Sequence, residues 1–191
     1  DEKELLCVAL GELGNAYNDK GDAQQAIHYY EKSLVINHEI GDQSWQGTTL
    51  GNLGLAYSHL GDIKRAIQYY EESLVIARKI DNINMQISAL GKLGEGYKNL
   101  SQVRLAIKYF EQQFTIAHIN KLQRGESNAL ANLGNAYARL GELQQAMEYY
   151  EKSLRIDTEI GNRHGEGAVL GSLGNIYADL GDERRAIEYY V

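Results

Sequence analysis

The segment LGNLGLAYSHLGDIKRAIQYYEESL, residues 50–74, decides the fold because it contains one complete structural unit. In its first half, the residues at the i, i+3, i+4 and i+7 spacing of one helical face are Leu50, Leu53, Gly54 and Tyr57. In its second half, the matching stripe consists of Ile63, Ala66, Ile67, Tyr70 and Leu74. Between the halves, Gly61 suits the left-handed residue that ends a helix, and Asp62 can cap the next helix. The segment therefore predicts two antiparallel helices joined by a short turn.

This pattern recurs at a constant interval along the whole chain of 191 residues. The strings of the first helix are LGELGNAY (10–17), LGNLGLAY (50–57), LGKLGEGY (90–97), LANLGNAY (130–137) and LGSLGNIY (170–177). Those of the second helix are AIHYYEKSL (26–34), AIQYYEESL (66–74), AIKYFEQQF (106–114), AMEYYEKSL (146–154) and the truncated AIEYY (186–190). All 14 tyrosines fall at three positions of the repeat, which indicates a packing role for them. We expect a single array with units at about 1–40, 41–80, 81–120, 121–160 and a truncated 161–191.

Glycines in the middle of the first helix of each unit are unfavourable, because each lowers helix stability by about 1 kcal/mol relative to alanine. Their presence therefore indicates a packing requirement. Gly54 shares its face with Leu50 and Tyr57, so we expect a neighbouring helix to approach its bare backbone closely. A single helix pair cannot bury its own apolar face, and stacked neighbours must complete the core. The sequence therefore predicts an all-α solenoid of antiparallel helix pairs, with four full repeats and a truncated fifth.

These residues resemble the tetratricopeptide repeat (TPR) family, whose motif reads W-x2-L-G-x2-Y, then Ala, an aromatic residue, Ala and Pro. The second unit supplies Leu50, Leu53, Gly54, Tyr57, Ala66, Tyr70 and Ser73 at those positions. The resemblance implies a right-handed superhelix. The period is longer than the usual value of about 34 residues, and we expect the extra residues to lengthen the second helix and its turn. Repeats of this length resemble Partner of Inscuteable (Pins) cell-polarity adaptors and the TPR arrays of bacterial signalling and STAND-type regulatory proteins.

Charge and composition exclude several functions. A net charge of −7 argues against general nucleic-acid binding and against docking on anionic membranes. The single Cys7 cannot form an internal disulfide, and no apolar run is long enough to span a bilayer. The five histidines show no metal-ligand spacing, and no phosphate-binding loop occurs. We therefore expect no catalytic residue, cofactor or metal, and a cytoplasmic location. The chain has no starting Met and stops inside a helical pattern, so we expect a fragment of a longer protein.

The family resemblance implies that the first helices line a concave, partner-binding face. The stripe opposite the Leu/Gly/Tyr face supplies the candidate residues Trp45, Thr48, Asn52, Leu55, Met85, Lys92, Glu95, Asn128, Asn132, Asn135, Arg139 and Asn175. Asparagine is a poor residue for a helix interior, so these amides are candidates for binding the backbone of an extended peptide. A hydrated polar face without a ligand is the alternative. Trp45 either anchors a ligand at the groove rim or packs against the preceding helix.

We expect a non-enzymatic interaction module that binds a protein or peptide. One alternative is a sensor segment of a larger multidomain signalling ATPase. Another is a self-assembling array, because truncation of the fifth unit should leave the apolar face of helix 166–180 poorly covered. The third unit is irregular at Ser101, Gln102 and Gln113, which indicates either neutral drift with repacking or a special contact surface.

Overall fold

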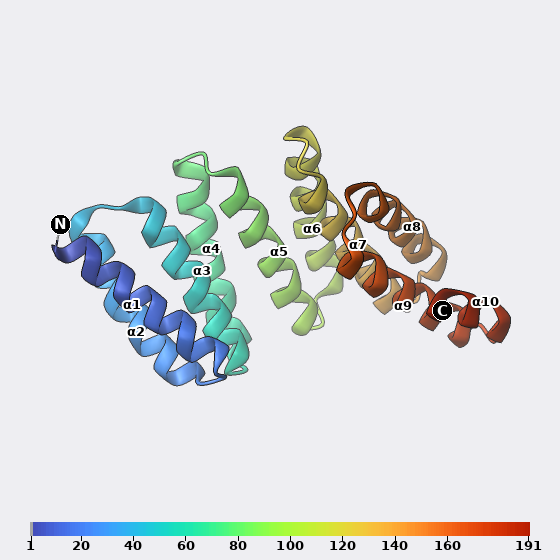
Figure 1. The fold of residues 1–191 in the computed structure, drawn as a ribbon, viewed down its shortest axis with the longest axis horizontal. Coiled ribbons are helices and arrows are strands. Elements are labelled where there is room, and N and C mark those ends of the chain that lie inside the picture. Colours follow the sequence, from blue (N-terminus) through green and yellow to red (C-terminus); the bar gives the residue numbers. More distant parts are fainter. Residues whose placement is uncertain (1) are drawn as a thin grey trace. The chain divides into compact units, whose positions relative to one another are not determined.

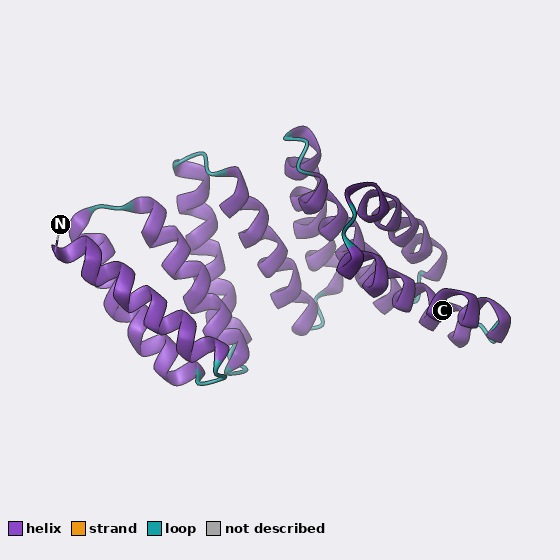
Figure 2. Cartoon of the chain, in the orientation of Figure 1, coloured by secondary structure: helices purple, strands orange, loops and turns teal. Residues whose placement is uncertain are grey.

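The computed structural model describes residues 2–191, which form ten α-helices and no strand (Figure 1, Figure 2). The first helices of the five repeats are α1 (Glu2–Asp19), α3 (Gln43–His59), α5 (Ile83–Asn99), α7 (Gln123–Arg139) and α9 (Arg163–Asp179). The second helices are α2 (Ala23–Ile40), α4 (Ile63–Lys79), α6 (Val103–Ile119), α8 (Leu143–Ile160) and α10 (Glu183–Tyr190). The predicted all-α arrangement of helix pairs is confirmed. None of these helices combines the length and apolar character needed to cross a membrane.

Each break between helices contains a left-handed residue, and in six of the nine breaks within residues 2–191 an Asp or Asn side chain also caps the following helix. Gly61 has a φ of 87°, and the Asp62 side chain accepts a hydrogen bond from the backbone N–H of Arg65 at 3.1 Å. Non-glycine residues take the left-handed conformation in three turns, at Asp81, Ser101 and Lys121. The turn after α4 spans residues 80–82 and is no longer than the turn at 60–62. The expected lengthening of the second helix and its turn relative to the usual repeat stays a prediction.

The helices form two compact units, one with α1–α5 up to Leu100 and one with α6–α10 from Ser101 onward. In the first unit, α1 contacts α3 and α3 contacts α5, whereas the second helices α2 and α4 do not contact each other. In the other unit, α7 contacts α9, whereas α8 contacts neither α6 nor α10. The first helices therefore form the inner face of each unit, as the family resemblance implies.

In four of the five repeats, a tyrosine ring of the second helix packs against the bare backbone of a glycine in the first helix. A Cβ atom added at Gly54 would lie 2.5 Å from a carbon of the Tyr70 ring, which a real structure does not allow. The same contact joins Gly14 to Tyr30, Gly134 to Tyr150, and Gly174 to Tyr190. The predicted close approach at Gly54 is confirmed, and it explains why the repeat retains an unfavourable helical residue.

The remaining tyrosines also serve packing. Within the second repeat, the Tyr57 and Tyr69 rings stack at 5.3 Å between centroids with 12° between their planes. Equivalent stacks join Tyr17 to Tyr29, Tyr137 to Tyr149, and Tyr177 to Tyr189. Offset aromatic pairs of this kind stabilise a fold beyond the area that they bury. The interpretation of the tyrosines as packing residues is confirmed.

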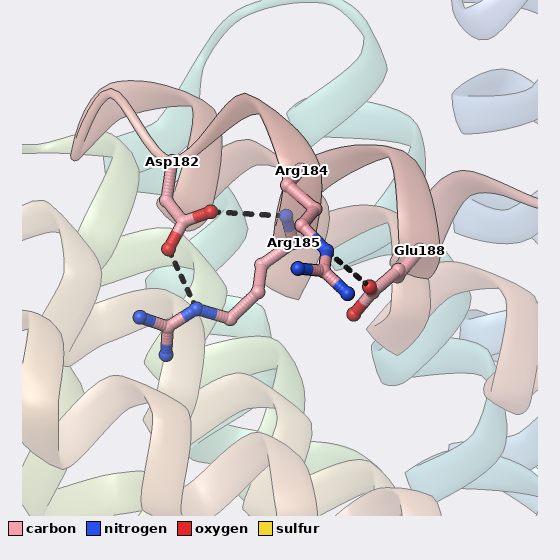
Figure 3. A network of polar contacts seen from close by, with 4 residues as sticks. All are labelled: Asp182, Arg184, Arg185 and Glu188. Atoms are coloured by element: carbon pink, nitrogen blue, oxygen red, sulfur yellow. Dashed lines mark hydrogen bonds and ion pairs between the residues drawn. The ribbon is translucent and has the colours of Figure 1, made fainter.

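Asp182, in the turn before α10, pairs with Arg185 of that helix (Figure 3). Its carboxylate accepts a hydrogen bond from the backbone N–H of Arg185 at 3.0 Å and pairs with the Arg185 guanidinium at 2.6 Å. The Arg185 guanidinium in turn lies over the Tyr177 ring, 4.8 Å from its centroid. The pKa of Asp182 is lowered mainly by the hydrogen bond from the backbone of Arg185 and then by the hydrogen bond from its side chain. Asp62, Arg65 and Tyr57 repeat the arrangement.

Of the exposed large apolar residues in the fifth repeat, Ile187 and Tyr190 lie on α10, and Leu180 lies at the C-cap of α9. Val169 and Leu173 are 2% and 1% exposed, because α8 covers them. Ile187 and Tyr190 on α10 are 61% and 53% exposed. The expectation that helix 166–180 has a poorly covered apolar face is therefore wrong for Val169 and Leu173 and holds only at Leu180, which is 56% exposed.

The irregular third repeat keeps its turn but loses polar contacts. Ser101 has a φ of 61°, so it takes the left-handed conformation that glycine supplies elsewhere. Gln102 makes no side-chain capping hydrogen bond to α6. The Oε1 atom of buried Gln113 has no hydrogen-bond partner within residues 2–191. The missing cap at Gln102 and the unsatisfied oxygen of Gln113 both lower the stability of this repeat. An unsatisfied buried acceptor costs about 1–3 kcal/mol.

Gly134→Leu should unfold or strongly destabilise the second unit, because the new Cβ would lie 2.6 Å from the Tyr150 ring. Gly171→Ala is the matched control, because no atom lies within 4 Å of the added Cβ. It should stabilise the fold by about 1 kcal/mol through helix propensity. Thermal unfolding followed by circular dichroism compares the two. Equal melting temperatures for the Gly134→Leu protein and the parent would contradict the packing argument.

Candidate functional site

A groove of about 320 Å³ lies on the inner face of the first unit, between α3 and α5, with α4 beneath it. Five of the predicted residues line it, namely Thr48, Asn52, Leu55, Met85 and Lys92. The other lining residues are Gly47, Gly51, Tyr70, Ser73, Asn82, Asn84, Ser88 and Ala89. The structure therefore brings the predicted residues of the second and third repeats together at one concave place.

Small residues keep this groove open. Gly47 lets Met85 lie against the α3 backbone, since an added Cβ would be 2.5 Å from the Met85 sulfur. Ser73 on α4 donates a hydrogen bond to the Gly47 carbonyl at 2.8 Å and so holds α4 close below α3. The groove consequently has a floor of backbone and small side chains, with Leu55 and Met85 as its apolar walls.

Among the described residues, Lys92 is the only cationic side chain that lines the groove. It is exposed and has no ion-pair or hydrogen-bond partner within the described part of the chain. Asn52 donates from Nδ2 to the Asn15 Oδ1 atom at 3.2 Å, which links α3 to α1 and leaves the Asn52 Oδ1 atom available. The groove thus offers a positive charge and an amide acceptor beside an apolar wall.

Two of the predicted residues in the first unit do not line this groove. Trp45 lies at the start of α3, one turn before Thr48, and is 38% exposed. Glu95 on α5 is paired with Lys98 at 2.8 Å between the carboxylate oxygen and Nζ. The charge of Glu95 is therefore already compensated within its own helix.

The asparagines of the second unit divide into two kinds. The Asn135 Oδ1 atom accepts a hydrogen bond from the Tyr150 hydroxyl at 2.7 Å, and Asn175 accepts one from Tyr190 at 2.7 Å. Asn128 and Asn132 make no hydrogen bond through their side chains to residues 2–191, and Arg139 has no ion pair there. The assumption that Asn135 stands apart from the Leu/Gly/Tyr packing is wrong, because its amide is bonded to the buried tyrosine.

Sequence reasoning missed the tyrosine hydroxyls as polar groups of the inner face. Tyr70 lines the groove with its ring buried under Gly54, although the pattern indicated packing alone. A signal was present in the sequence. Three repeats with asparagine directly after the glycine that contacts the tyrosine carry that tyrosine 15 residues later, in the pairs Asn15–Tyr30, Asn135–Tyr150 and Asn175–Tyr190. The third repeat has Glu95 and Phe110 instead.

Burial extends the protonated state of these hydroxyls to higher pH. Loss of solvent raises the pKa of Tyr70 from 10.0 to about 12. Burial also raises the pKa of Tyr30 to about 12, with smaller contributions from the negative charges of Asp19 and Glu12. At neutral pH the tyrosines of the inner face are therefore hydrogen-bond donors. Residues 2–191 bring together no group of three or more His, Cys, Asp or Glu side chains that could hold a metal ion.

Stacked helix pairs with a groove on their inner face define a helical-repeat scaffold. The model of the Tetratricopeptide repeat family matches residues 5–79, 85–159 and 125–191, and the chain belongs to this family. Repeats of this family act as scaffolds for protein–protein interaction. No curated protein sequence is significantly similar to the chain.

Solved structures share the fold at low sequence identity. BtubC (BKLC) from P. vanneervenii matches with a TM-score of 0.83 and 18% identity, over 94% of this chain and 75% of that one. A second match is a signal transduction ATPase with numerous domains (STAND) from Pyrococcus horikoshii, which has a tetratricopeptide repeat sensor. Its TM-score is 0.83 and its sequence identity 20%, over 98% of this chain and 30% of that one. A Rap protein complexed with Competence and Sporulation Factor matches with a TM-score of 0.84 and 18% identity, over 97% of this chain and 52% of that one. At these identities the likeness concerns the fold alone.

Asn135→Ala should lower the free energy of unfolding relative to Asn132→Ala by about 0.5–1.5 kcal/mol, the usual contribution of a hydrogen bond. Both variants gain the same helix propensity, but only the first loses the bond from Tyr150. Chemical denaturation of the two proteins gives the difference directly. Equal stabilities would show that this bond contributes nothing to the fold.

The melting temperature should fall as the pH rises from about 10 to 12. An unfolded tyrosine titrates near pH 10, whereas Tyr30 and Tyr70 keep their protons up to a pKa of about 12. In this range the unfolded chain binds fewer protons than the folded one, so stability decreases with pH. The double variant Tyr30→Phe, Tyr70→Phe should show a smaller decrease in melts followed by circular dichroism. An identical decrease in both proteins would contradict the assignment.

Proposed function

We propose that the chain holds an extended segment of another protein in the groove between α3 and α5 on the inner face of its first unit. The observation that carries this proposal is the combination of an apolar wall, Leu55 and Met85, with polar groups that have no partner in the described chain, above all Lys92. A groove with apolar walls and a few convergent polar groups is the usual form of a binding site.

The shape of the groove favours an extended chain over a compact ligand. Its lining runs over successive turns of two neighbouring helices, from Gly47 to Leu55 on α3 and from Asn84 to Lys92 on α5, so a peptide backbone can lie along them. Amides such as Asn52 can then pair with that backbone, and the apolar wall can take alternate side chains. On the inner face of the second unit, Asn132 and Arg139 offer further polar groups without partners in the described residues.

The family and one of the similar structures support this reading. The chain belongs to a repeat family of interaction scaffolds. A Rap protein with the same fold is complexed with Competence and Sporulation Factor, which is a precedent for a bound partner on such a fold.

Blocking the groove tests the proposal. Ser88 is exposed on α5 and lines the groove, so Ser88→Tyr should fill it without entering the core. Gln68 is exposed on α4 outside the groove, and Gln68→Tyr is the matched control. A library of random decapeptides displayed on phage is selected on the parent chain, and the enriched peptides are synthesised. Their affinities, measured by fluorescence anisotropy, should fall about tenfold or more for Ser88→Tyr, a loss of about 1.4 kcal/mol, and stay unchanged for Gln68→Tyr.

Failure of the proposal would be plain in the same measurements. If no peptide is enriched, or if the enriched peptides bind the Ser88→Tyr protein as tightly as the parent, the groove is not the binding site.

A further inference from the structure

One buried tyrosine in the groove differs from its equivalents in having no partner for its hydroxyl. Tyr30, Tyr150 and Tyr190 each donate a hydrogen bond to an asparagine of the same repeat, at 2.7 Å in all three. In the second repeat Leu55 stands where that asparagine should be, and the hydroxyl of Tyr70 makes no hydrogen bond within the described part of the chain. Tyr70 is only 3% exposed, yet it lines the groove. An unpaired donor of a buried side chain therefore faces the proposed binding site.

The first repeat shows what the groove lacks. There the Asn15 Oδ1 atom accepts two hydrogen bonds, from the Tyr30 hydroxyl at 2.7 Å and from the Asn52 amide at 3.2 Å. Tyr30 belongs to α2, whereas Asn52 comes from α3, the first helix of the next repeat. Two donors from different repeats thus converge on one acceptor oxygen of the chain.

Lys92 is the counterpart of Asn52 in the groove, because it holds in α5 the repeat position that Asn52 holds in α3, just as Tyr70 is equivalent to Tyr30. Both Lys92 and Tyr70 line the same concave surface. The second unit supports this equivalence. Burial raises the pKa of Tyr150, and Ser172, which holds the same repeat position in α9, partly offsets that effect, although its hydroxyl donates to the Ala168 carbonyl. The groove therefore has the two donors of the first repeat, but Leu55 supplies no acceptor between them.

We propose, on the basis of the function proposed above, that the groove between α3 and α5 selects an acidic side chain of the bound segment. Its carboxylate takes the place that the Asn15 Oδ1 atom occupies in the first repeat, accepting hydrogen bonds from the Tyr70 hydroxyl and the Lys92 ammonium. A neighbouring apolar residue of the same segment packs against Leu55 and Met85.

Charge favours a carboxylate over a neutral carbonyl group in this position. Lys92 has no counter-ion in the described chain, and the nearest acid on α5, Glu95, is paired with Lys98. A hydrogen bond between an ammonium group and a carboxylate is about twice as strong as one between neutral groups. A single cation with one hydroxyl matches the single charge of an aspartate or glutamate.

The test uses peptides enriched from the decapeptide library on the parent chain. Three variants remove, in different ways, the carboxylate-binding place between the Tyr70 hydroxyl and the Lys92 ammonium. Tyr70→Phe deletes the hydroxyl, Lys92→Gln deletes the charge, and Leu55→Asn supplies an internal acceptor to Tyr70. Tyr150→Phe is the matched control, because its hydroxyl is bonded to Asn135 within the chain. Circular dichroism verifies that each variant is folded, and Tyr70→Phe should be as stable as the parent because its hydroxyl has no partner to lose.

The enriched peptides should share an Asp or Glu, and its replacement by Asn or Gln should weaken binding to the parent about tenfold or more. Tyr70→Phe and Leu55→Asn should each weaken binding of the acidic peptide about threefold to tenfold, and Tyr150→Phe should not change it. In the double variant Tyr70→Phe, Lys92→Gln, the acidic peptide and its amide form should bind alike.

Two results would overturn the proposal while leaving the binding groove intact. One is enrichment of peptides that bind in a Ser88-sensitive manner but carry no acidic residue. The other is an equal effect of Tyr70→Phe and Tyr150→Phe on the acidic peptide. Peptides insensitive to Ser88→Tyr would instead overturn the proposed function itself.

Discussion

The contact between a tyrosine ring of the second helix and a bare glycine backbone of the first helix is the constraint on which four of the five repeats depend. At Gly54 even one additional carbon would lie 2.5 Å from the Tyr70 ring. The glycine costs helix propensity, but it lets two helices approach closely enough to bury Ala66 and Leu53 almost completely. The approach also brings the neighbouring Tyr69 into stacking distance of Tyr57, so one small residue positions two aromatic contacts.

The same contact fixes the chemistry of the inner face. A ring held under the glycine directs its hydroxyl toward the residue that follows that glycine, and asparagine at that position accepts the hydrogen bond, as Asn135 does from Tyr150. Leu55 interrupts this pattern at the place where the groove opens. A residue that the fold needs for packing thus becomes available to a ligand through a single change on the opposite helix.

Neighbouring repeats are joined by polar contacts that tolerate such changes. The Tyr97 hydroxyl donates to Glu71 of the preceding repeat at 3.1 Å, and Tyr57 makes the equivalent bond to Glu31 at 3.5 Å. Because each repeat contacts mainly its neighbours, a substitution on the inner face of one repeat leaves the packing of the others unchanged. This separation allows a scaffold to vary its binding surface without changing its fold.

The sequence by itself determined the helix pairs, their turns and the close approach at Gly54, because these follow from local spacing, from the conformational freedom of Gly61 and from the capping chemistry of Asp62. It also placed Asn52 and Lys92 on the inner face, since a helical period of 3.6 residues assigns faces without knowledge of the partner helix. Only the tertiary structure decided which polar groups of the inner face have a hydrogen-bond partner within the chain. The pairing of Asn135 with Tyr150, the lack of a partner for Tyr70 and the position of Trp45 outside the groove each depend on contacts between two helices. Such contacts are set by how the helices pack, and no pattern within one helix contains them.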